Sequence, residues 1–264
     1  AANTGPNPMT IGVPGNVPYV ITVGAMSDNY TPKDGTDDTL ASFSAAGPTV
    51  EGFVKPNVVA PGGHVLAVMD FQSQIAQDHP NFHDGRDYFT MSGTSQAAAV
   101  VSGVVALMLQ HDPSLTPDEV KCRLMASAHP AVDEGGELAY SIFQQGAGMV
   151  NAYDAFYTTA SGCANQGVNI DNDLAGIQHY GGRANRDEFG NYYIMDLDGY
   201  SWGDGYSWGD GYAWDDGYAW DDGYAWDDGY AWDDGYSWGD GYAWDDGYAW
   251  GSAVMAVNVW VPQE

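Results

Sequence analysis

The sequence has few cations, few cysteines and no long apolar run. Of its 264 residues only 7 are Lys or Arg, whereas 36 are Asp or Glu, and the formal net charge is -29. Because so acidic a chain is repelled by the phosphate backbone, we expect no nucleic-acid partner. The sequence also lacks any run of about 18 apolar residues, so we expect no membrane-spanning helix.

Two cysteines, Cys122 and Cys163, form the only intrachain pair that the sequence allows. A disulfide between them would require an oxidising compartment and a Cα separation of no more than about 7 Å. The sequence leaves two alternatives open, a disulfide or two inert buried thiols.

Charge is unevenly distributed along the chain. All seven cations lie at or before Arg186, whereas 16 of the 36 acids lie from Asp196 onward. The C-terminal part therefore carries more than half of the net charge. High-salt surroundings and basic substrates both fit this balance, but net charge bears more directly on solubility and association than on specificity.

One stretch contains a candidate nucleophile. A Gly-Thr-Ser turn at residues 93–95 leads into an apolar segment, Ala97 to Leu109, which is long enough for about four helical turns. Ser95 then lies in the first turn of a buried helix, where free backbone N–H groups and the helix dipole favour an anion. In isolation, the alternative is a serine that only caps a helix.

The residues around Ser95 indicate more than a helix cap. Residues 93–103 read Gly-Thr-Ser-Gln-Ala-Ala-Ala-Val-Val-Ser-Gly and resemble the nucleophile block of the subtilisin-like serine peptidases (subtilases), usually Gly-Thr-Ser-Met-Ala-Ala-Pro followed by a small, apolar helix. Residues 2–6, 55–62 and 146–152 match three further blocks of that family in the right order. The resemblance covers residues 1 to about 157.

The sequence departs from the family pattern at four positions. Gln96 stands where Met is preferred, Ala99 where Pro is preferred, Asn57 where Asp is usual, and Ala2 where Gly usually precedes the Asn. None of these changes removes a reacting group. Gln96 and Ala2 adjoin the expected oxyanion donors, so these two are the departures able to alter the local geometry.

The resemblance implies a serine endopeptidase that acts on protein or peptide substrates, is secreted or held at a cell surface, and needs no cofactor for catalysis. Ser95 would be the nucleophile, and the Asn3 side chain would donate a hydrogen bond to the oxyanion. An amide suits this role because it supplies N–H groups without a titrating charge. The implied fold class is α/β, the C-terminal half of a subtilisin-like parallel-sheet sandwich.

The family's catalytic base lies in a His-Gly-Thr-His block, which does not occur in this sequence. The Asp block is missing as well. Asp34-Gly35-Thr36 has the wrong order for it, and we interpret it as a surface loop, with a bound cation as the alternative. His79 and His83 have neighbouring carboxylates, but we interpret them as part of a polar loop near the substrate cleft. We therefore expect the natural N-terminal part to be absent from this sequence and the isolated chain to be inactive.

The scaffold can be predicted from local patterns. Val17–Ala25 and Val54–Ala60 are short and rich in β-branched residues, which is typical of strands in a parallel sheet covered on both faces. Thr116, Pro117 and Glu119 predict a helix that starts with an N-cap, a proline in the first position and a capping box. We assign residues 1–157 to a partial peptidase domain and residues 158–195 to a linker with some local structure.

Residues 196–264 form an acidic repeat region. A hexapeptide Gly-Tyr-(Ala/Ser)-Trp-(Asp/Gly)-Asp places Trp at every sixth position from 202 to 250. The repeat predicts either short strands that turn at each Asp-Gly step or an extended, self-repelling chain. Its aromatic and acidic side chains favour binding of a surface polysaccharide or calcium, and the alternative is a solubilising tail. The alternative function of the whole chain is a non-catalytic surface or glycan-binding protein on a degenerate peptidase half.

Overall fold

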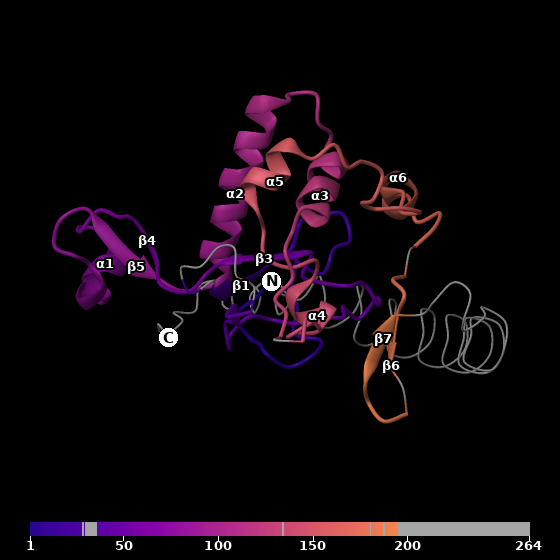
Figure 1. Ribbon diagram of the computed structural model, residues 1–264, viewed down its shortest axis with the longest axis horizontal. Helices are drawn as coiled ribbons and strands as arrows, with labels where there is room; N and C mark the ends of the chain where they lie inside the picture. The colour runs from indigo at the N-terminus through magenta and orange to yellow at the C-terminus, as the bar shows by residue number, and fades with distance from the viewer. Residues whose placement is uncertain (28, 30–35, 134, 180, 187, 195–264) are drawn as a thin grey trace. The chain divides into compact units, whose positions relative to one another are not determined.

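The computed structural model describes residues 1–27, 29, 36–133, 135–179, 181–186 and 188–194 (Figure 1). The chain divides into two compact units, of which the first comprises residues 1–182 and the second begins at Arg183. The whole of the predicted repeat region, residues 196–264, lies outside the described residues, as do Asp34 and Gly35 of the predicted loop.

Among the described residues, five strands lie in the first unit, and the hairpin β6–β7 belongs to the second. The strands are β1 (Val23–Ser27), β2 (Thr39–Leu40), β3 (Val58–Pro61), β4 (Val65–Val68), β5 (Tyr88–Met91), β6 (Ala184–Arg186) and β7 (Tyr192–Ile194). The helices are α1 (Gln74–Asp78), α2 (Thr94–His111), α3 (Pro117–Ala126), α4 (Ile142–Gln145), α5 (Ala152–Tyr157) and α6 (Ile170–Leu174), with a 3₁₀ turn at Pro80–Phe82.

The central sheet has the order β2-β1-β3. β1 and β3 run parallel, with Val23 opposite Val58 and Ala25 opposite Ala60, and β2 is antiparallel to β1. The described chain is therefore a mixed α/β structure with a small sheet that contains a parallel pair. This pair confirms the prediction of parallel strands in this part of the sequence.

The predicted strand boundaries were wrong at their N-terminal ends. We predicted strands from Val17 and Val54, whereas β1 begins at Val23 and β3 at Val58. The reason at the first boundary lies in the backbone hydrogen bonds. The carbonyls of Pro18 and Val20 accept hydrogen bonds from lysine side chains instead of from a neighbouring strand.

The core lies between the sheet and α2, and Figure 1 shows α5 beside α2 and α3. The buried residues of α2 recur at helical spacing on one face: Thr94, Ala97, Val101, Val104 and Met108. They pack with the β1 and β3 side chains into one apolar cluster. Burial of a valine-sized side chain contributes about 1.5–3 kcal/mol, so this face holds α2 firmly on the sheet.

Helix α3 begins as predicted. The Thr116 hydroxyl accepts a hydrogen bond from the Glu119 N–H at 3.3 Å, and the Glu119 carboxylate accepts one from the Thr116 N–H at 2.8 Å. This reciprocal arrangement is a capping box, and Pro117 occupies the first helical position.

Cys122 and Cys163 are joined by a disulfide, with their Cα atoms 5.1 Å apart. The structure thus selects the disulfide over the two buried thiols. The bond fastens the segment that follows α5 to helix α3 across a sequence separation of 41. None of the helices in the described part of the chain is both long and apolar enough to cross a bilayer.

Candidate active site

Ser95 is exposed at the second position of α2, as the sequence predicted. The first turn of this helix has no side-chain cap at Gly93, and only some of its N–H groups have hydrogen-bond partners. The Thr94 N–H donates to Asn3 Oδ1 at 2.9 Å, and the Gln96 N–H donates to the Gly93 carbonyl at 3.1 Å. Among the described residues no partner accepts the Ser95 N–H, so this donor faces outward beside its own hydroxyl.

Asn3 lies against the same turn, although it is 91 residues away in sequence. Its Oδ1 accepts both the N–H and the hydroxyl of Thr94, each at 2.9 Å. A backbone N–H can only donate, so the oxygen of the amide must face Thr94 and the nitrogen must face the other way. Asn3 Nδ2 lies 3.5 Å from the position that a Cβ on Gly93 would occupy.

Backbone hydrogen bonds hold Asn3 in place on both sides. The carbonyl of Ala2 accepts the N–H of Ala45, and the N–H of Gly5 donates to the carbonyl of Phe43, each at 2.9 Å. A Cβ at Gly5 would lie 1.8 Å from the carbonyl oxygen of Ser44. Only glycine therefore permits this close approach, which brings the Asn3 loop onto the edge of the core.

A second glycine contact joins the end of β3 to the turn that carries Ser95. The Gly93 N–H donates to the Gly62 carbonyl at 2.8 Å, and a Cβ on Gly62 would lie 2.6 Å from Ala25 Cβ. Two of the matched sequence blocks, residues 55–62 and 93–103, thus meet through backbone atoms. The block at residues 146–152 also meets residues 55–62, since the Ala147 N–H donates to the Asn57 carbonyl and the Val59 N–H to the Gly148 carbonyl, each at 2.9 Å.

Gln96 folds back over this turn. Its Oε1 lies 2.7 Å from the position that a Cβ on Gly93 would take, and its Nε2 lies 3.6 Å from Met91 Sδ. The family's usual Met would place an apolar group there. The substitution therefore places a polar amide beside the turn that carries Ser95, and it leaves the Asn3–Thr94 contact intact.

His83 is built into the β4–β5 hairpin. Its Nδ1 accepts the Gly85 N–H at 2.9 Å, and its Nε2 lies 3.0 Å from the carbonyl oxygen of Met69, so both ring nitrogens are engaged. Because backbone groups of the hairpin occupy both nitrogens, this geometry favours the polar-loop interpretation. His79 ends α1 and packs against the ring of Phe82.

Two buried lysines were not predicted from the sequence. Lys55 is 1% exposed and donates to the carbonyl of Val20 at 2.8 Å and to Asn57 Oδ1 at 3.1 Å. Burial, with a smaller contribution from the charge of Lys121, lowers the pKa of Lys55 to about 6. The one available signal was its position next to a buried β-strand, where a cation is unusual.

Lys121 is the second buried cation. Its Nζ donates to the carbonyl of Pro18 at 2.5 Å and to Asn165 Oδ1 at 2.8 Å. Burial lowers its pKa to about 8, against an opposing effect of Asp118. Within the described ranges, no three His, Cys, Asp or Glu side chains come together in a way that would hold a metal ion.

The fold and site define an α/β protein with a serine at the start of a buried helix and an asparagine amide beside it. The profile described as the Subtilase family matches residues 1–169, and the chain belongs to this family. The match extends beyond residue 157, where the sequence resemblance was expected to end.

Named relatives are similar to this chain over the same region. Serine protease AprX of Bacillus subtilis (strain 168) is 45% identical over 152 residues, which cover 58% of this chain and 33% of AprX. An uncharacterised protein of Aquifex aeolicus (strain VF5) is 38% identical over 120 residues, covering 45% of this chain and 54% of the relative. The chain thus spans between a third and about half of the length of these two relatives.

Among solved structures, fervidolysin from Fervidobacterium pennivorans is described as a keratinolytic enzyme related to subtilisin. It is similar to this chain at 26% identity with a TM-score of 0.41, over 56% of this chain and 20% of fervidolysin.

Proposed function

We propose that this chain supplies the nucleophile and the oxyanion donors of a serine endopeptidase that hydrolyses peptide bonds in proteins. The observation that carries the proposal is the pair of outward-facing donors at the start of α2. Ser95 presents its hydroxyl and an unbonded N–H, and Asn3 is turned so that its Nδ2 faces away from Thr94. Hydroxyl, N–H and amide are the groups that acyl transfer to serine requires.

In the proposed reaction Ser95 Oγ attacks the carbonyl carbon of the scissile peptide bond. The carbonyl π electrons move to oxygen, and the Ser95 N–H and Asn3 Nδ2 stabilise the resulting oxyanion. The Oγ proton passes to a histidine base and then to the leaving amine as the C–N bond breaks, which leaves an acyl-serine. Water then attacks the acyl carbon by the same route and releases the acid.

In this mechanism the base and its orienting carboxylate come from family blocks that are not among these 264 residues. Loss of the base from a serine-peptidase triad lowers turnover by several orders of magnitude, even when the oxyanion donors remain. We therefore expect the isolated chain to hydrolyse peptides at no useful rate. We also expect a fluorophosphonate to label it no more than it labels a Ser95→Ala variant.

The test supplies the missing groups. Residues 1–182 would be joined to a subtilase segment that carries the family's Asp and His blocks, and the chimera would be assayed with a fluorophosphonate and an internally quenched peptide. We expect Ser95-dependent labelling and cleavage, with kcat lowered about 10²–10³-fold by Asn3→Ala and KM changed little. A folded chimera, shown by cooperative unfolding, that lacks Ser95-dependent labelling would contradict the proposal.

We further propose that the chain works in an oxidising, extracellular setting. The Cys122–Cys163 disulfide supports this proposal because such bonds persist mainly outside the reducing cytosol. A redox-sensitive probe of the cysteine pair in cells, read as free thiol against disulfide, tests the location.

The second candidate function is non-catalytic binding of a surface polysaccharide, with calcium bound to and ordering the Asp side chains of the hexapeptide repeat. It is supported by the regular spacing of Tyr, Trp and Asp in the repeat at residues 199–250. Retention of residues 199–264 on immobilised polysaccharide, and their circular dichroism with and without calcium, test it. No retention and no spectral change would leave only the solubilising role. A start codon close to Ala1 in the gene would favour this candidate over the peptidase, whereas upstream Asp and His blocks would favour the peptidase.

A further inference from the structure

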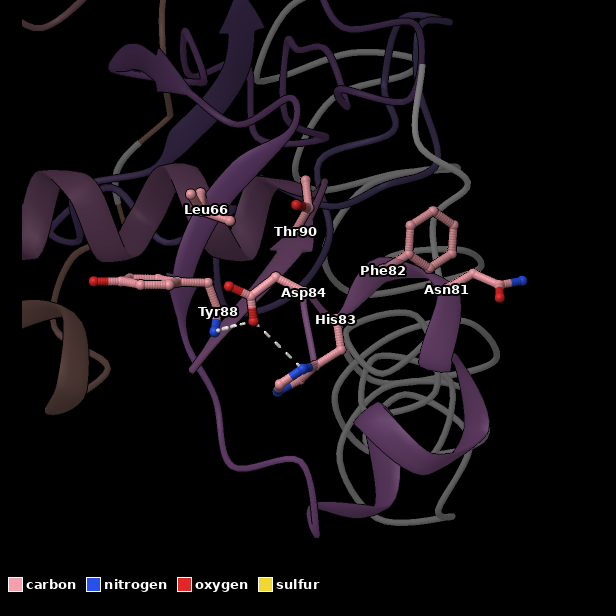
Figure 2. Close-up of a pocket in the computed structure, with 7 residues that line it drawn as sticks. All are labelled: Leu66, Asn81, Phe82, His83, Asp84, Tyr88 and Thr90. Carbon is pink, nitrogen blue, oxygen red and sulfur yellow. Dashed lines mark hydrogen bonds and ion pairs between the residues drawn. The ribbon is translucent and has the colours of Figure 1, made fainter. Parts of the chain in front are cut away.

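A cavity of about 280 Å³ opens on the β4–β5 hairpin, the strand pair that leads into the nucleophile helix. Its walls come from both strands and from the 3₁₀ turn between them (Figure 2). The lining residues are Leu66, Asn81, Phe82, His83, Asp84, Tyr88 and Thr90. The proposed catalytic groups are not among them.

The carboxylate of Asp84 stands among the lining side chains and accepts hydrogen bonds from backbone N–H groups (Figure 2). Oδ1 accepts the N–H of Arg86 at 2.7 Å and the N–H of Tyr88 at 3.1 Å. The Asp87 N–H is a further backbone donor to this carboxylate, and 40% of the side chain is exposed. The hydrogen bonds from Tyr88 and Arg86 lower the pKa of Asp84, so the carboxylate is ionised at neutral pH.

No Lys or Arg is among the residues that line this cavity. The His83 side chain is fully buried, and its Nδ1 accepts the Gly85 N–H and lies 3.7 Å from Asp84 Oδ1. Arg86 donates to Asp84 through its backbone only, and its side chain does not line the cavity. Residues 64–91 contain four Asp and a single Arg, so the surroundings of the cavity are acidic.

Apolar surface flanks the carboxylate. Leu66 on β4 is 61% exposed, and Tyr88 on β5 is 45% exposed, although both carry large apolar side chains. An aliphatic wall, an aromatic face and an oriented carboxylate match the parts of an arginine side chain. The methylenes pack on apolar surface, the guanidinium lies on an aromatic ring, and its N–H groups bind carboxylate oxygen.

We propose that this cavity is a binding site for an arginine side chain of a polypeptide, with the guanidinium on Asp84 and the methylenes between Leu66 and Tyr88. Lysine is the weaker ligand because its ammonium cannot stack on the ring or bind in a fork. The substrate role of the site rests on the proposed peptidase function. Thr90 and Ser95 are five residues apart, at most about 17 Å of extended chain, so a peptide bound at Ser95 reaches the cavity within roughly five residues.

The test is a binding measurement that involves no catalysis. A fluorescein-labelled nonapeptide of Gly and Ala with one central Arg would be titrated with the full chain by anisotropy at 0.15 M salt. The same peptide with citrulline, which keeps the shape and loses the charge, is the comparison. We expect the Arg peptide to bind about tenfold more tightly than the citrulline peptide, as for other charge-assisted hydrogen bonds.

The variants separate the site from the general acidity of the chain. Asp84→Asn is expected to abolish the preference for Arg, whereas Asp87→Asn, an equal charge change at an exposed residue outside the cavity lining, retains it. Tyr88→Ala keeps the backbone N–H that binds Asp84 and is expected to weaken Arg binding several-fold, as for loss of an aromatic contact to a cation. It serves as the second variant if Asp84→Asn loosens the turn.

Two results would overturn the proposal. One is equal affinity for the Arg and citrulline peptides, and the other is an equal loss of Arg affinity in Asp84→Asn and Asp87→Asn, which would indicate bulk electrostatics alone. Ser95→Ala is expected to bind both peptides as the wild type does. Failure of the Ser95 chemistry is therefore distinguishable from failure of this site.

Discussion

Lys55 and Asn57 form an unusual pair at the start of β3. The family usually has Asp at the second position, and a carboxylate there would neutralise the buried ammonium. In this chain the amide oxygen of Asn57 accepts from both the Lys55 Nζ at 3.1 Å and the Thr22 N–H at 2.9 Å. Asn57 thus supplies a hydrogen-bond acceptor, as Asp would, but not the negative charge. Burial therefore lowers the pKa of Lys55 to about 6.

We expect this group to make the chain more stable as the pH rises. Between the folded pKa of Lys55, about 6, and its ordinary value of 10.5, the unfolded chain binds a proton that the folded chain does not. The free energy of unfolding therefore increases with pH in this window, by up to about 1.4 kcal/mol per unit. Lys121 also makes the free energy of unfolding increase with pH, but only above about pH 8, because its pKa is lowered to about 8. Urea unfolding at pH 6.5 to 9 measures this slope.

Two variants check the assignment. Asp and Glu are ionised throughout this range, so the acidic C-terminal part contributes no slope. Lys55→Met is expected to remove only part of the increase below about pH 8, because the Ala1 amine, whose pKa burial lowers from 8.0 to about 5, contributes the same sign there. Asn57→Asp is expected to reduce it as well, because a carboxylate beside the ammonium raises the pKa of Lys55. A slope that is unchanged in both variants would refute the role of Lys55.

Helices α2 and α3 begin in different ways. Helix α3 is started by its own sequence, since the Thr116 and Glu119 side chains satisfy each other's backbone N–H groups. Helix α2 has no side-chain cap at Gly93, and its first N–H is bound by Asn3 from a distant loop. The helix with a local cap is scaffold, whereas the helix with an open first turn is the one that presents Ser95.

For the cap of α3 we expect Thr116→Ala to lower the free energy of unfolding by about 1 kcal/mol, because the Glu119 N–H loses its acceptor. Urea denaturation of the purified chain measures the change. Thr159→Ala removes the same hydroxyl at an exposed position and is expected to change stability by less than about 0.5 kcal/mol. Equal effects of the two substitutions would show that the capping box contributes nothing.

At the scale of the whole molecule, one covalent bond ties the later part of the family region to α3. Cys122 is fully buried on that helix, and Cys163 follows α5 by six residues, with a sequence separation of 41 between the cysteines. A bond that closes a long loop restricts the unfolded chain more than the folded one. The disulfide therefore stabilises the α3–α5 side of the first unit.

We expect reduction of this disulfide to lower the free energy of unfolding by about 4 kcal/mol at most, as the loop length predicts. Urea unfolding with and without a reductant, equilibrated from the unfolded side, measures the difference. A Cys122→Ala/Cys163→Ala double variant is expected to be as unstable as the reduced chain and insensitive to reductant. Alkylation of two thiols in the untreated protein would contradict the disulfide.

Much of the scaffold could be predicted because its signals are local. The apolar period of α2, the cap of α3 and the β-branched runs each act within a few residues, so they are readable without the fold. The start of β1 was misplaced because the backbone from Pro18 to Val20 is bound by lysines that lie 35 and 103 positions further along the chain. No local pattern contains such partners.

The sequence by itself determined that a serine stands at the start of an apolar helix, that the blocks of one peptidase family occur in order, and that two cysteines are available. Only the tertiary structure decided that these cysteines pair, that the Asn3 amide turns its oxygen to Thr94, and that Asp84 lies in a cavity between Leu66 and Tyr88. The physical reason is distance along the chain. Caps and helical periods are completed by near neighbours, whereas Asn3 and Thr94 meet only after 91 residues have folded between them.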